Sequence, residues 1–307
     1  MKMATTVLGL KTFAASDPVD YNEINDNYNK IDNGVKTALQ GRAAYNLLDN
    51  SNFADLVAQA GLNGAHGSTA YIADRWKSGN ATATANSGYT TISSTEKEGR
   101  IVQMLSAAVA GKTVTAAAKV ASANTIYFGV YYIQNSVSKY INNSFVSPNG
   151  VIMVSGAIPA DATNIEFRIY TSYIDGGGSC NVYWATLYEG SYTADTLPAY
   201  QPKGYAAELA ECMRYYRRFI NSAPAMSTAA TAIEVEMPLE PPMRVVPTIT
   251  INSVGPAYTP EGTKSVSGSY SATNTVNKAG YVFYTPSIGI GLPCVITGID
   301  GYLSADL

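Results

Sequence analysis

The sequence of 307 residues has a single histidine and three cysteines, which restricts the catalytic and metal chemistry open to it. His66 lies in the glycine-rich stretch GLNGAHGSTA, so histidine-dependent triads and metal sites have little scope, and we interpret His66 as a solvated loop residue. Cys180, Cys212 and Cys294 are odd in number and far apart, which fits neither a disulfide framework nor a zinc spacing. Free thiols of this kind are expected in a protein made in a reducing cytoplasm.

Charge is also scarce, since 14% of the residues are charged against about 25% in an average protein. Acidic residues number 23 and basic residues 20, and the net charge of -3 leaves no basic footprint for nucleic acid. No run of about 18 apolar residues is present to span a bilayer, and the N-terminus lacks the pattern of a signal peptide. We therefore expect neither nucleic-acid binding nor membrane insertion.

Tyrosine is abundant, with 23 residues, and much of the chain reads as short strands. Between residues 45 and 200 the sequence alternates or runs apolar over short stretches that are separated by Gly, Asn, Ser or Pro. No helical segments separate these stretches, so we predict a mainly β protein with an antiparallel, jelly-roll-like β-sandwich over residues 44–202. The predicted strands are IVQML, KTVTAAAKV, TIYFGVYYIQ, GVIMVSGAI, NIEFRIYTSY and CNVYWATLYEG.

A first helix is predicted near the N-terminus, where Asp17 and Pro18 form a start signal and Gly41 a stop. Apolar residues recur alternately three and four positions apart, which is the a/d pattern of a coiled coil. So short a helix would be marginal alone, and we infer that it packs in an oligomer. The alternative is a single helix packed on its own domain. The seam consists of Tyr21, Ile24, Tyr28, Ile31, Val35 and Ala38.

A second helix is predicted after Pro202 and Gly204, within the stretch from Leu197 to Ile220. Its apolar positions again fall three and four residues apart, and arginines in the last turn suit the helix dipole. Strand-like sequence precedes and follows it, so we predict a junction helix that opens a small C-terminal β-domain over residues 203–307. The predicted buried face is Tyr205, Leu209, Cys212, Met213, Tyr216, Phe219 and Ile220.

Four segments of this chain resemble tail fibre and receptor-binding proteins of bacteriophages and prophages. They are YQPKGYAAELAECMRYY (200–216), PLEPPMRVVPTITI (238–251), NLLDNSNF (46–53) and YIADRWK (71–77). The last two are similar to the opening of a carbohydrate-binding-module-like sandwich. The resemblance implies a homotrimeric virion tail protein. Residues 1–43 would attach to phage tail or baseplate proteins, residues 44–202 would form the sandwich, and residues 203–307 would form a receptor-binding tip.

Aromatic side chains are the candidates for contact with a bacterial surface polysaccharide, because the apolar face of a sugar ring stacks on a π surface. We single out Tyr127, Tyr131, Tyr132 and Trp184. Tyr127 and Tyr131 share one face of a predicted strand and Tyr132 points to the other, so one of the two sets belongs to the core. Trp76 is expected to be structural, with Asp74 and Arg75 fixing the loop around it.

Other chemistry has weaker support. Asp49, Asn50 and Asn52 supply oxygen atoms suited to a structural calcium, but their spacing does not demand one, and we expect no other cofactor. Glu234 and Glu236 lie on one face of a predicted strand, as a pair of glycosidase carboxylates would, although alternating acids usually mark a solvent face.

We therefore expect a non-catalytic protein that recognises a bacterial surface glycan during host adsorption. Two alternatives remain open: a polysaccharide depolymerase, and a baseplate or assembly protein that contacts only virion proteins. The first is weakened because the chain shows no regular β-helical repeat.

Overall fold

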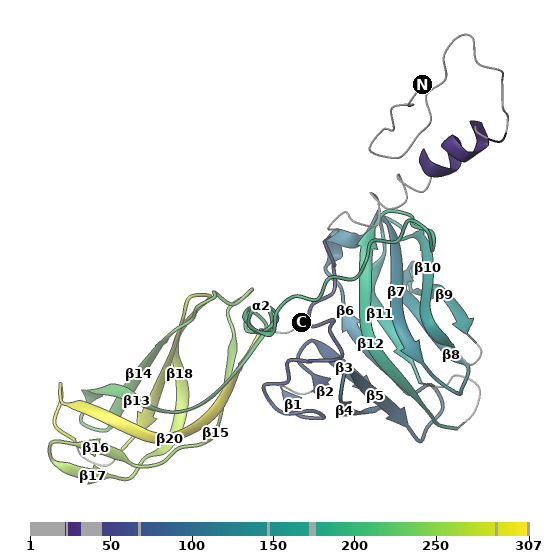
Figure 1. Cartoon of the computed structure of the whole chain (residues 1–307). Helices are drawn as coiled ribbons and strands as arrows, with labels where there is room; N and C mark the ends of the chain where they lie inside the picture. Colours follow the sequence, from purple (N-terminus) through teal and green to yellow (C-terminus); the bar gives the residue numbers. More distant parts are fainter. Residues whose placement is uncertain are drawn as a thin grey trace, which may run out of the picture.

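A computed structural model of the chain describes residues 22, 24–31, 45–66, 69–145, 148–171, 176–285 and 288–305. The predicted fold class is confirmed: two antiparallel β-domains are joined through the short helix α2 (Tyr205–Cys212) (Figure 1). No helix among the described residues has the length and apolar character needed to cross a membrane.

The N-terminal β-domain is a sandwich of two sheets. The larger sheet contains, in spatial order, β1 (Ala65–His66), β2 (Thr69–Ala73), β3 (Trp76–Gly79), β6 (Arg100–Met104), β11 (Thr163–Tyr170), β8 (Ile126–Gln134) and β9 (Val137–Phe145). The smaller sheet contains β10 (Asn149–Ala157), β7 (Thr113–Ala121), β12 (Gly178–Glu189), β5 (Tyr89–Ser94) and β4 (Thr82–Asn86). A 3-10 turn, η1 (Ala107–Val109), leads from β6 to β7.

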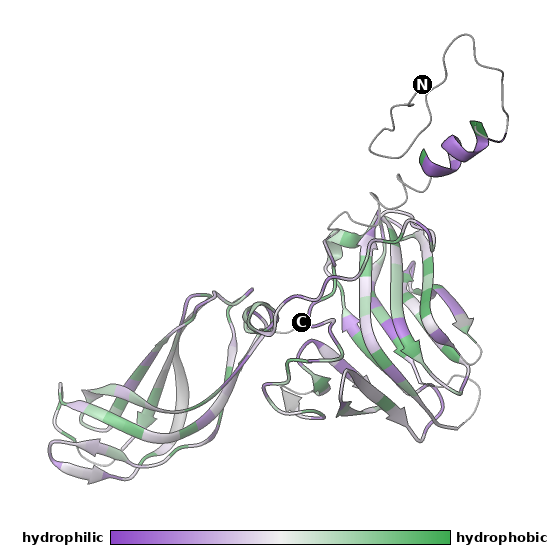
Figure 2. Ribbon diagram, in the orientation of Figure 1, coloured by the Kyte–Doolittle hydropathy of each residue, from purple (hydrophilic) through white to green (hydrophobic). Residues whose placement is uncertain are grey.

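The sandwich core lies between these sheets and takes mainly alternate residues of their strands. Along several strands the hydropathy changes from residue to residue (Figure 2). On β8, Phe128, Val130 and Tyr132 point inward and are buried. Trp76, which we expect to be structural, is completely buried, and its ring centre lies 5.0 Å from that of Phe53. Burial of one such side chain contributes about 1.5–3 kcal/mol. The buried aromatic residues Phe53, Trp76 and Phe128 are therefore a main source of the stability of the sandwich.

The junction helix begins where the sequence predicts, at Tyr205 after Gly204, but the prediction of one helix reaching Ile220 is wrong. α2 ends at Cys212, and strand β13 (Tyr216–Ala229) follows. From Arg217 onward, alternate residues are buried, which is the period of a strand, and Ile220 is 59% exposed. A helix would expose Arg217 among the arginines of its last turn, but in the strand this side chain is only 7% exposed.

The C-terminal β-domain has a separate hydrophobic core beneath one curved eight-stranded sheet. Its strands, in spatial order, are β17 (Gly262–Lys264), β16 (Ala257–Thr259), β20 (Pro293–Ser304), β13, β14 (Ala232–Pro238), β19 (Lys278–Tyr284) and β18 (Ser267–Thr275), while β15 (Thr248–Ser253) pairs with β20. The proline-rich stretch between β14 and β15 forms no strand, because proline cannot donate to a central ladder.

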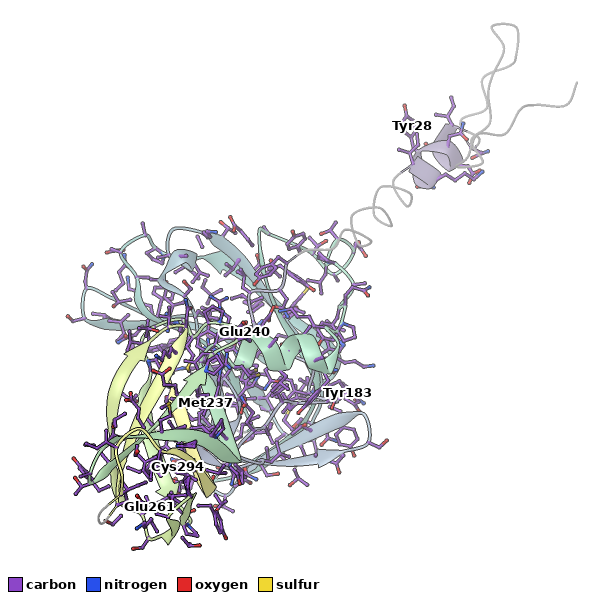
Figure 3. The ribbon with its side chains drawn as sticks, turned by 90° about the vertical axis from the view of Figure 1, so that its left-hand side faces the viewer. Tyr28, Tyr183, Met237, Glu240, Glu261 and Cys294 are labelled. Atoms are coloured by element: carbon purple, nitrogen blue, oxygen red, sulfur yellow. The ribbon has the colours of Figure 1, made fainter. Side chains whose placement is uncertain are left out.

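Residues 24–31 are helical and lie inside the predicted coiled-coil segment. Asp26 and Lys30, one turn apart, form an ion pair of 2.6 Å. On the predicted seam, Tyr28 is 67% exposed and Ile31 is 40% exposed. In Figure 3 the helix that carries Tyr28 lies apart from both β-domains.

The rest of the predicted N-terminal segment cannot be compared with the structure. Residues 1–20, and the seam positions Tyr21, Val35 and Ala38, lie outside the described residues. The pairing of this helix with other copies stays a prediction.

Candidate functional site

The outer face of the larger sheet carries a row of paired tyrosines and charged residues. Tyr131 on β8 lies directly opposite Glu166 on β11 and Tyr140 on β9. Glu166 lies in turn opposite Met104 on β6. Residues that are opposite one another in an antiparallel pair point to the same face, so these four side chains form one row across four strands. The row is the centre of what we call the tyrosine–arginine face, which also includes Arg168 and Tyr170.

Arg168 holds the tyrosine–arginine face together. Its guanidinium lies 3.6 Å from the centre of the Tyr131 ring, and its Nε donates to Glu166 Oε2 at 2.7 Å. Its Nη1 donates to the hydroxyl oxygens of Tyr170 at 3.1 Å and Tyr140 at 3.5 Å. Burial alone would lower the pKa of Arg168, but the hydrogen bonds to Glu166 and Tyr170 raise it overall, so the side chain stays charged. The result is a fixed cation beneath an aromatic surface.

The most accessible aromatic ring of this face is Tyr140, which is 45% exposed, whereas Tyr131 is only 9% exposed. The ring centres of the two tyrosines are 5.1 Å apart in an edge-on arrangement. Burial raises the pKa of the Tyr140 phenol, so the hydroxyl is neutral near pH 7 and can donate or accept a hydrogen bond. An exposed ring beside fixed polar groups is the arrangement that sugar rings require for stacking.

The four aromatic residues singled out from the sequence do not form one site. Tyr127 and Tyr131 lie on the outer face of β8, and Tyr132 belongs to the core and is 8% exposed. Trp184 lies on β12 in the other sheet, and its ring is stacked on Tyr200 at 5.0 Å with an interplanar angle of 12°.

Tyr140 and Arg168 were missed by the sequence reasoning. The signal was the alternation in NIEFRIY, which puts Glu166, Arg168 and Tyr170 on one face, but the register with β8 and β9 could not be read from the sequence.

The segments that resemble tail fibre proteins come together at the junction between the two domains. The Asn50 backbone N–H donates to Glu208 Oε2 of α2 at 2.7 Å. The Gln59 side-chain amide connects Asp74 Oδ2 at 2.6 Å with the Tyr216 carbonyl at 2.8 Å. The Asn50–Glu208 and Gln59–Tyr216 bonds each join residues more than 100 positions apart in the chain. Segments 46–53 and 200–216, which carry the resemblance, therefore also take part in connecting the domains.

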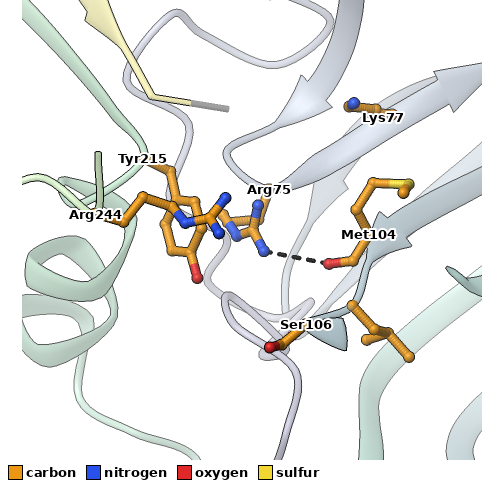
Figure 4. Close-up of a pocket in the computed structure, with 7 residues that line it drawn as sticks. Arg75, Lys77, Met104, Ser106, Tyr215 and Arg244 are labelled. Carbon is orange, nitrogen blue, oxygen red and sulfur yellow. Dashed lines mark hydrogen bonds between the residues drawn. The ribbon is translucent and has the colours of Figure 1, made fainter. Parts of the chain in front are cut away.

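A small pocket of about 90 Å³ opens at this junction, beside the Met104 end of the tyrosine–arginine face (Figure 4). Arg75 lies 3.6 Å over the Tyr215 ring, and Arg244 lies over the same ring at 5.3 Å. Arg75 Nη2 donates to the Met104 carbonyl at 3.3 Å, and Arg75 Nε contacts Asp49 Oδ2 at 3.0 Å. The remaining lining comes from Lys77, Leu105 and Ser106.

The calcium candidates are each engaged in contacts with the protein. Asp49 pairs with Arg75, and Asn52 Oδ1 accepts the Ala54 N–H at 3.3 Å. Asn50 is 1% exposed and makes three side-chain hydrogen bonds to backbone groups. The described residues contain no group of three or more His, Cys, Asp or Glu placed to hold a metal ion.

Glu234 and Glu236 lie on the outer face of β14, beside a shallow hollow of about 740 Å³ in the C-terminal domain. The hollow is lined mainly by apolar residues of β13 and β20, among them Met226 and Val295. Glu236 forms an ion pair with Lys278 of β19.

The cysteines carry no reactive thiol. All three are free and buried, and burial raises the pKa of Cys180 to about 12 and also raises the pKa of Cys212 and Cys294. A thiol that stays protonated at neutral pH is a poor nucleophile.

No protein-family model matches this chain, and no curated protein sequence matches it. Among solved structures, the chain is similar to the C-terminal family 22 carbohydrate-binding module of Clostridium thermocellum Xyn10B, with 19% identity, a TM-score of 0.31, and coverage of 39% of this chain and 87% of the module.

It is also similar to the tandem family 22 modules of Paenibacillus barcinonensis Xyn10C, with 10% identity, a TM-score of 0.33, and coverage of 87% and 99% of the two chains. For discoidin II of Dictyostelium discoideum the identity is 12%, the TM-score 0.21, and the coverage 80% and 88%. At such values the function of this chain has to be inferred from its own residues.

Proposed function

We propose that this chain is a non-catalytic receptor-binding protein of a bacteriophage tail, which forms a homotrimer and recognises a polysaccharide on the bacterial surface. The observation that carries the glycan part of the proposal is the tyrosine–arginine face. It presents the exposed ring of Tyr140 next to the fixed charges of Arg168 and Glu166. A π surface for the C–H face of a sugar, with hydrogen-bonding groups beside it for the hydroxyls, is what neutral and acidic glycans both need.

The tail part of the proposal rests on the resemblance of four segments to tail fibre proteins. The spatial arrangement agrees with it, because those segments meet at the junction where one β-domain ends and the next begins. The absence of catalysis is proposed because the candidate nucleophiles and acids are poorly suited: the thiols are protonated, and Glu236 is held in an ion pair.

The test is adsorption of the labelled full chain to a panel of bacteria, with and without periodate oxidation of their glycans. We expect binding that periodate abolishes, and we expect Tyr140→Ala to weaken it about tenfold, the loss of roughly 1.4 kcal/mol of stacking. Tyr258→Ala is a matched control, because Tyr258 is 53% exposed and lies in the C-terminal domain. Binding that survives periodate would contradict the proposal, and loss through Tyr258 alone would move the site to the C-terminal domain.

A depolymerase is the second candidate, favoured by one observation: Glu234 and Glu236 line the hollow on the C-terminal domain. Release of reducing ends from bacterial polysaccharide, abolished in Glu234→Gln, would establish it. We expect no release, because the hollow is mainly apolar and one of its two carboxylates is paired with Lys278.

A further inference from the structure

We propose that the pocket at the domain junction binds the anionic group of an acidic glycan, a carboxylate or a phosphate, while the tyrosine–arginine face holds the sugar rings. This inference rests on the proposed function and adds the chemical class of the ligand.

The charge of the pocket is the first argument. Three of its lining residues, Arg75, Lys77 and Arg244, are cations, and none of the lining residues is acidic. Asp49 forms an ion pair with Arg75 and so balances one of the three positive charges. A local excess of positive charge is unexpected on a chain whose net charge is -3. A concave site lined by one sign of charge attracts ligands of the opposite sign.

The rigidity of the pocket is the second argument. Arg75 is fixed by its stacking on Tyr215, by its bond to the Met104 carbonyl and by Asp49. Arg244 comes from the C-terminal domain, and its backbone N–H donates to the Arg214 carbonyl at 2.9 Å. The Arg244 guanidinium lies over the same Tyr215 ring as Arg75. Guanidinium groups that are already ordered lose little entropy when they bind an oxyanion, and Arg244 can contact one with two parallel hydrogen bonds.

The size and position of the pocket are the third argument. A space of about 90 Å³ suits a charged substituent rather than a chain of sugar rings. The pocket opens beside Met104, the first residue of the row that continues through Glu166 and Tyr131 to Tyr140. Lys77 lies opposite Val102 on the same outer face of the sheet. A glycan lying along the row would therefore bring one of its acidic groups to the pocket.

The pocket also assigns a role to the contact between the domains. Arg75 and Lys77 belong to the sandwich, whereas Tyr215 and Arg244 follow α2. Both parts of the chain are needed to complete the site, so an acidic ligand bound there would hold the two β-domains in the arrangement seen in Figure 1.

The experiment compares binding of the full chain to three immobilised polymers: polygalacturonate, the same polymer after carboxyl reduction, and poly(glycerol phosphate). We expect at least one anionic polymer to bind about tenfold or more tightly than the reduced one, with an affinity that falls as salt is added. The tighter of the two anionic polymers identifies the source of the charge as a carboxylate or a phosphodiester.

Arg244→Gln should remove the preference for the anionic polymer, and Arg244→Lys should retain part of it, because the charge remains but the planar fork is lost. Lys77→Gln provides a second variant from the other domain. Lys97→Gln, at an exposed residue, changes the net charge equally and should leave the preference unchanged. Thermal unfolding of each variant shows whether the fold is retained.

Equal binding to the anionic and reduced polymers, or a preference that persists in both Arg244→Gln and Lys77→Gln, would overturn the inference. Adsorption to bacteria separates this failure from that of the proposed function. If the chain adsorbs in a periodate-sensitive way but binds charged and reduced polymers equally, only the inference about the pocket fails. If the chain adsorbs to no bacterium, the proposed function fails.

Discussion

At the scale of single residues, Asn50 is a buried polar residue that makes several hydrogen bonds within the sandwich. Its side-chain amide donates to the carbonyls of Val57 and Asp74, at 2.8 and 2.7 Å, and its Oδ1 accepts the Val57 N–H at 2.9 Å. Its own carbonyl accepts the indole N–H of Trp76 at 2.7 Å. Its φ of 51° lies in the left-handed region, which asparagine tolerates better than most residues.

We expect Asn50→Ala to lower the free energy of unfolding by about 3 kcal/mol, because three hydrogen bonds to buried backbone groups are lost. Asn50→Asp should also destabilise, since a carboxylate cannot donate to two carbonyls. Urea unfolding would measure both changes, with Asn52→Ala as a control expected to cost about 0.5 kcal/mol or less. A calcium site would behave differently, because it would accept aspartate, and chelation by EGTA would lower the melting temperature.

Glu208 is a buried carboxylate at the junction. It is 2% exposed, its Oε2 accepts the Asn50 N–H, and its Oε1 has no hydrogen-bond partner among the described residues. Burial raises the pKa of Glu208 above its ordinary value of 4.5, and the Asn50 N–H and Lys203 oppose this only in part.

The direction of the resulting pH dependence follows from this raised pKa. Below pH 4.5 the Glu208 carboxyl is protonated in both the folded and the unfolded chain. As the pH rises, the unfolded chain ionises the group first, while the folded chain has to charge it in a buried place. The contribution of Glu208 to the free energy of unfolding therefore falls as the pH increases from 4.5 through the folded pKa.

Comparison of the full chain with Glu208→Gln by urea unfolding should show the wild type at its greatest relative stability near about pH 4 and at its least near about pH 7. Glu189→Gln, at a side chain that is 57% exposed, serves as the control for the loss of one carboxylate from the surface. A difference between wild type and Glu208→Gln that does not change with pH would contradict the burial argument.

At the scale of elements, the change from α2 to β13 depends on Arg217. This side chain is 7% exposed, its Nε donates to the Met213 carbonyl at 3.0 Å, and its Nη2 donates to the Pro241 carbonyl. Burial lowers the pKa of Arg217, although it remains a cation at neutral pH. One side chain thus satisfies the carbonyl at the end of the helix and connects β13 to the loop after β14.

We expect Arg217→Gln to lower the free energy of unfolding by about 2 kcal/mol, because two carbonyls near the core lose a charged donor. Arg214→Gln, three residues earlier and exposed, should change it by about 0.5 kcal/mol or less. Thermal or urea unfolding would compare the two variants. Equal effects at both positions would show that Arg217 does not stabilise the end of α2.

The strands of the sandwich and the segment from α2 to β13 show how far the sequence predicts the fold. The strands of the sandwich follow from alternating apolar residues, and the opposite faces of Tyr131 and Tyr132 follow from the period of a strand. The pattern failed where polar groups are buried, at Glu208 and Arg217, because their burial depends on partners far away in the sequence. For the same reason the pairing of Tyr131 with Arg168 could not be predicted: strand register is set by tertiary packing.

At the scale of the whole molecule, the chain consists of two β-domains with separate cores, and the C-terminal domain both begins and ends at the junction (Figure 1). The Ala305 backbone N–H donates to the Tyr215 carbonyl at 2.7 Å. The loops at the far end of this domain are therefore the parts most distant from the sandwich. A ligand that contacts both Arg75 and Arg244 acts across this junction, and it would be expected to restrict the movement of the domains relative to each other.

The oligomeric state is the remaining property of the whole molecule, and the N-terminal helix is its predicted determinant. Tyr28 and Ile31 lie one turn apart on this helix and are 67% and 40% exposed in the single chain. Apolar residues at heptad positions lose this exposure when helices coil around one another. We expect the full chain, of 32.5 kDa, to have the mass of a trimer in light scattering.

Ile31→Asp should lower this mass at the same protein concentration, because a charge at a seam position opposes burial. Asn29→Asp adds the same charge at an exposed position of the same helix outside the seam, and it should leave the mass of the assembly unchanged. A chain that begins at residue 44 separates two origins of the trimer: a monomeric mass would assign trimer formation to the helix, and a trimeric mass would assign it to the β-domains. If the full chain itself is monomeric, the helix is not a coiled coil, and a glycan-binding protein that acts as a monomer becomes the better account of the tyrosine–arginine face.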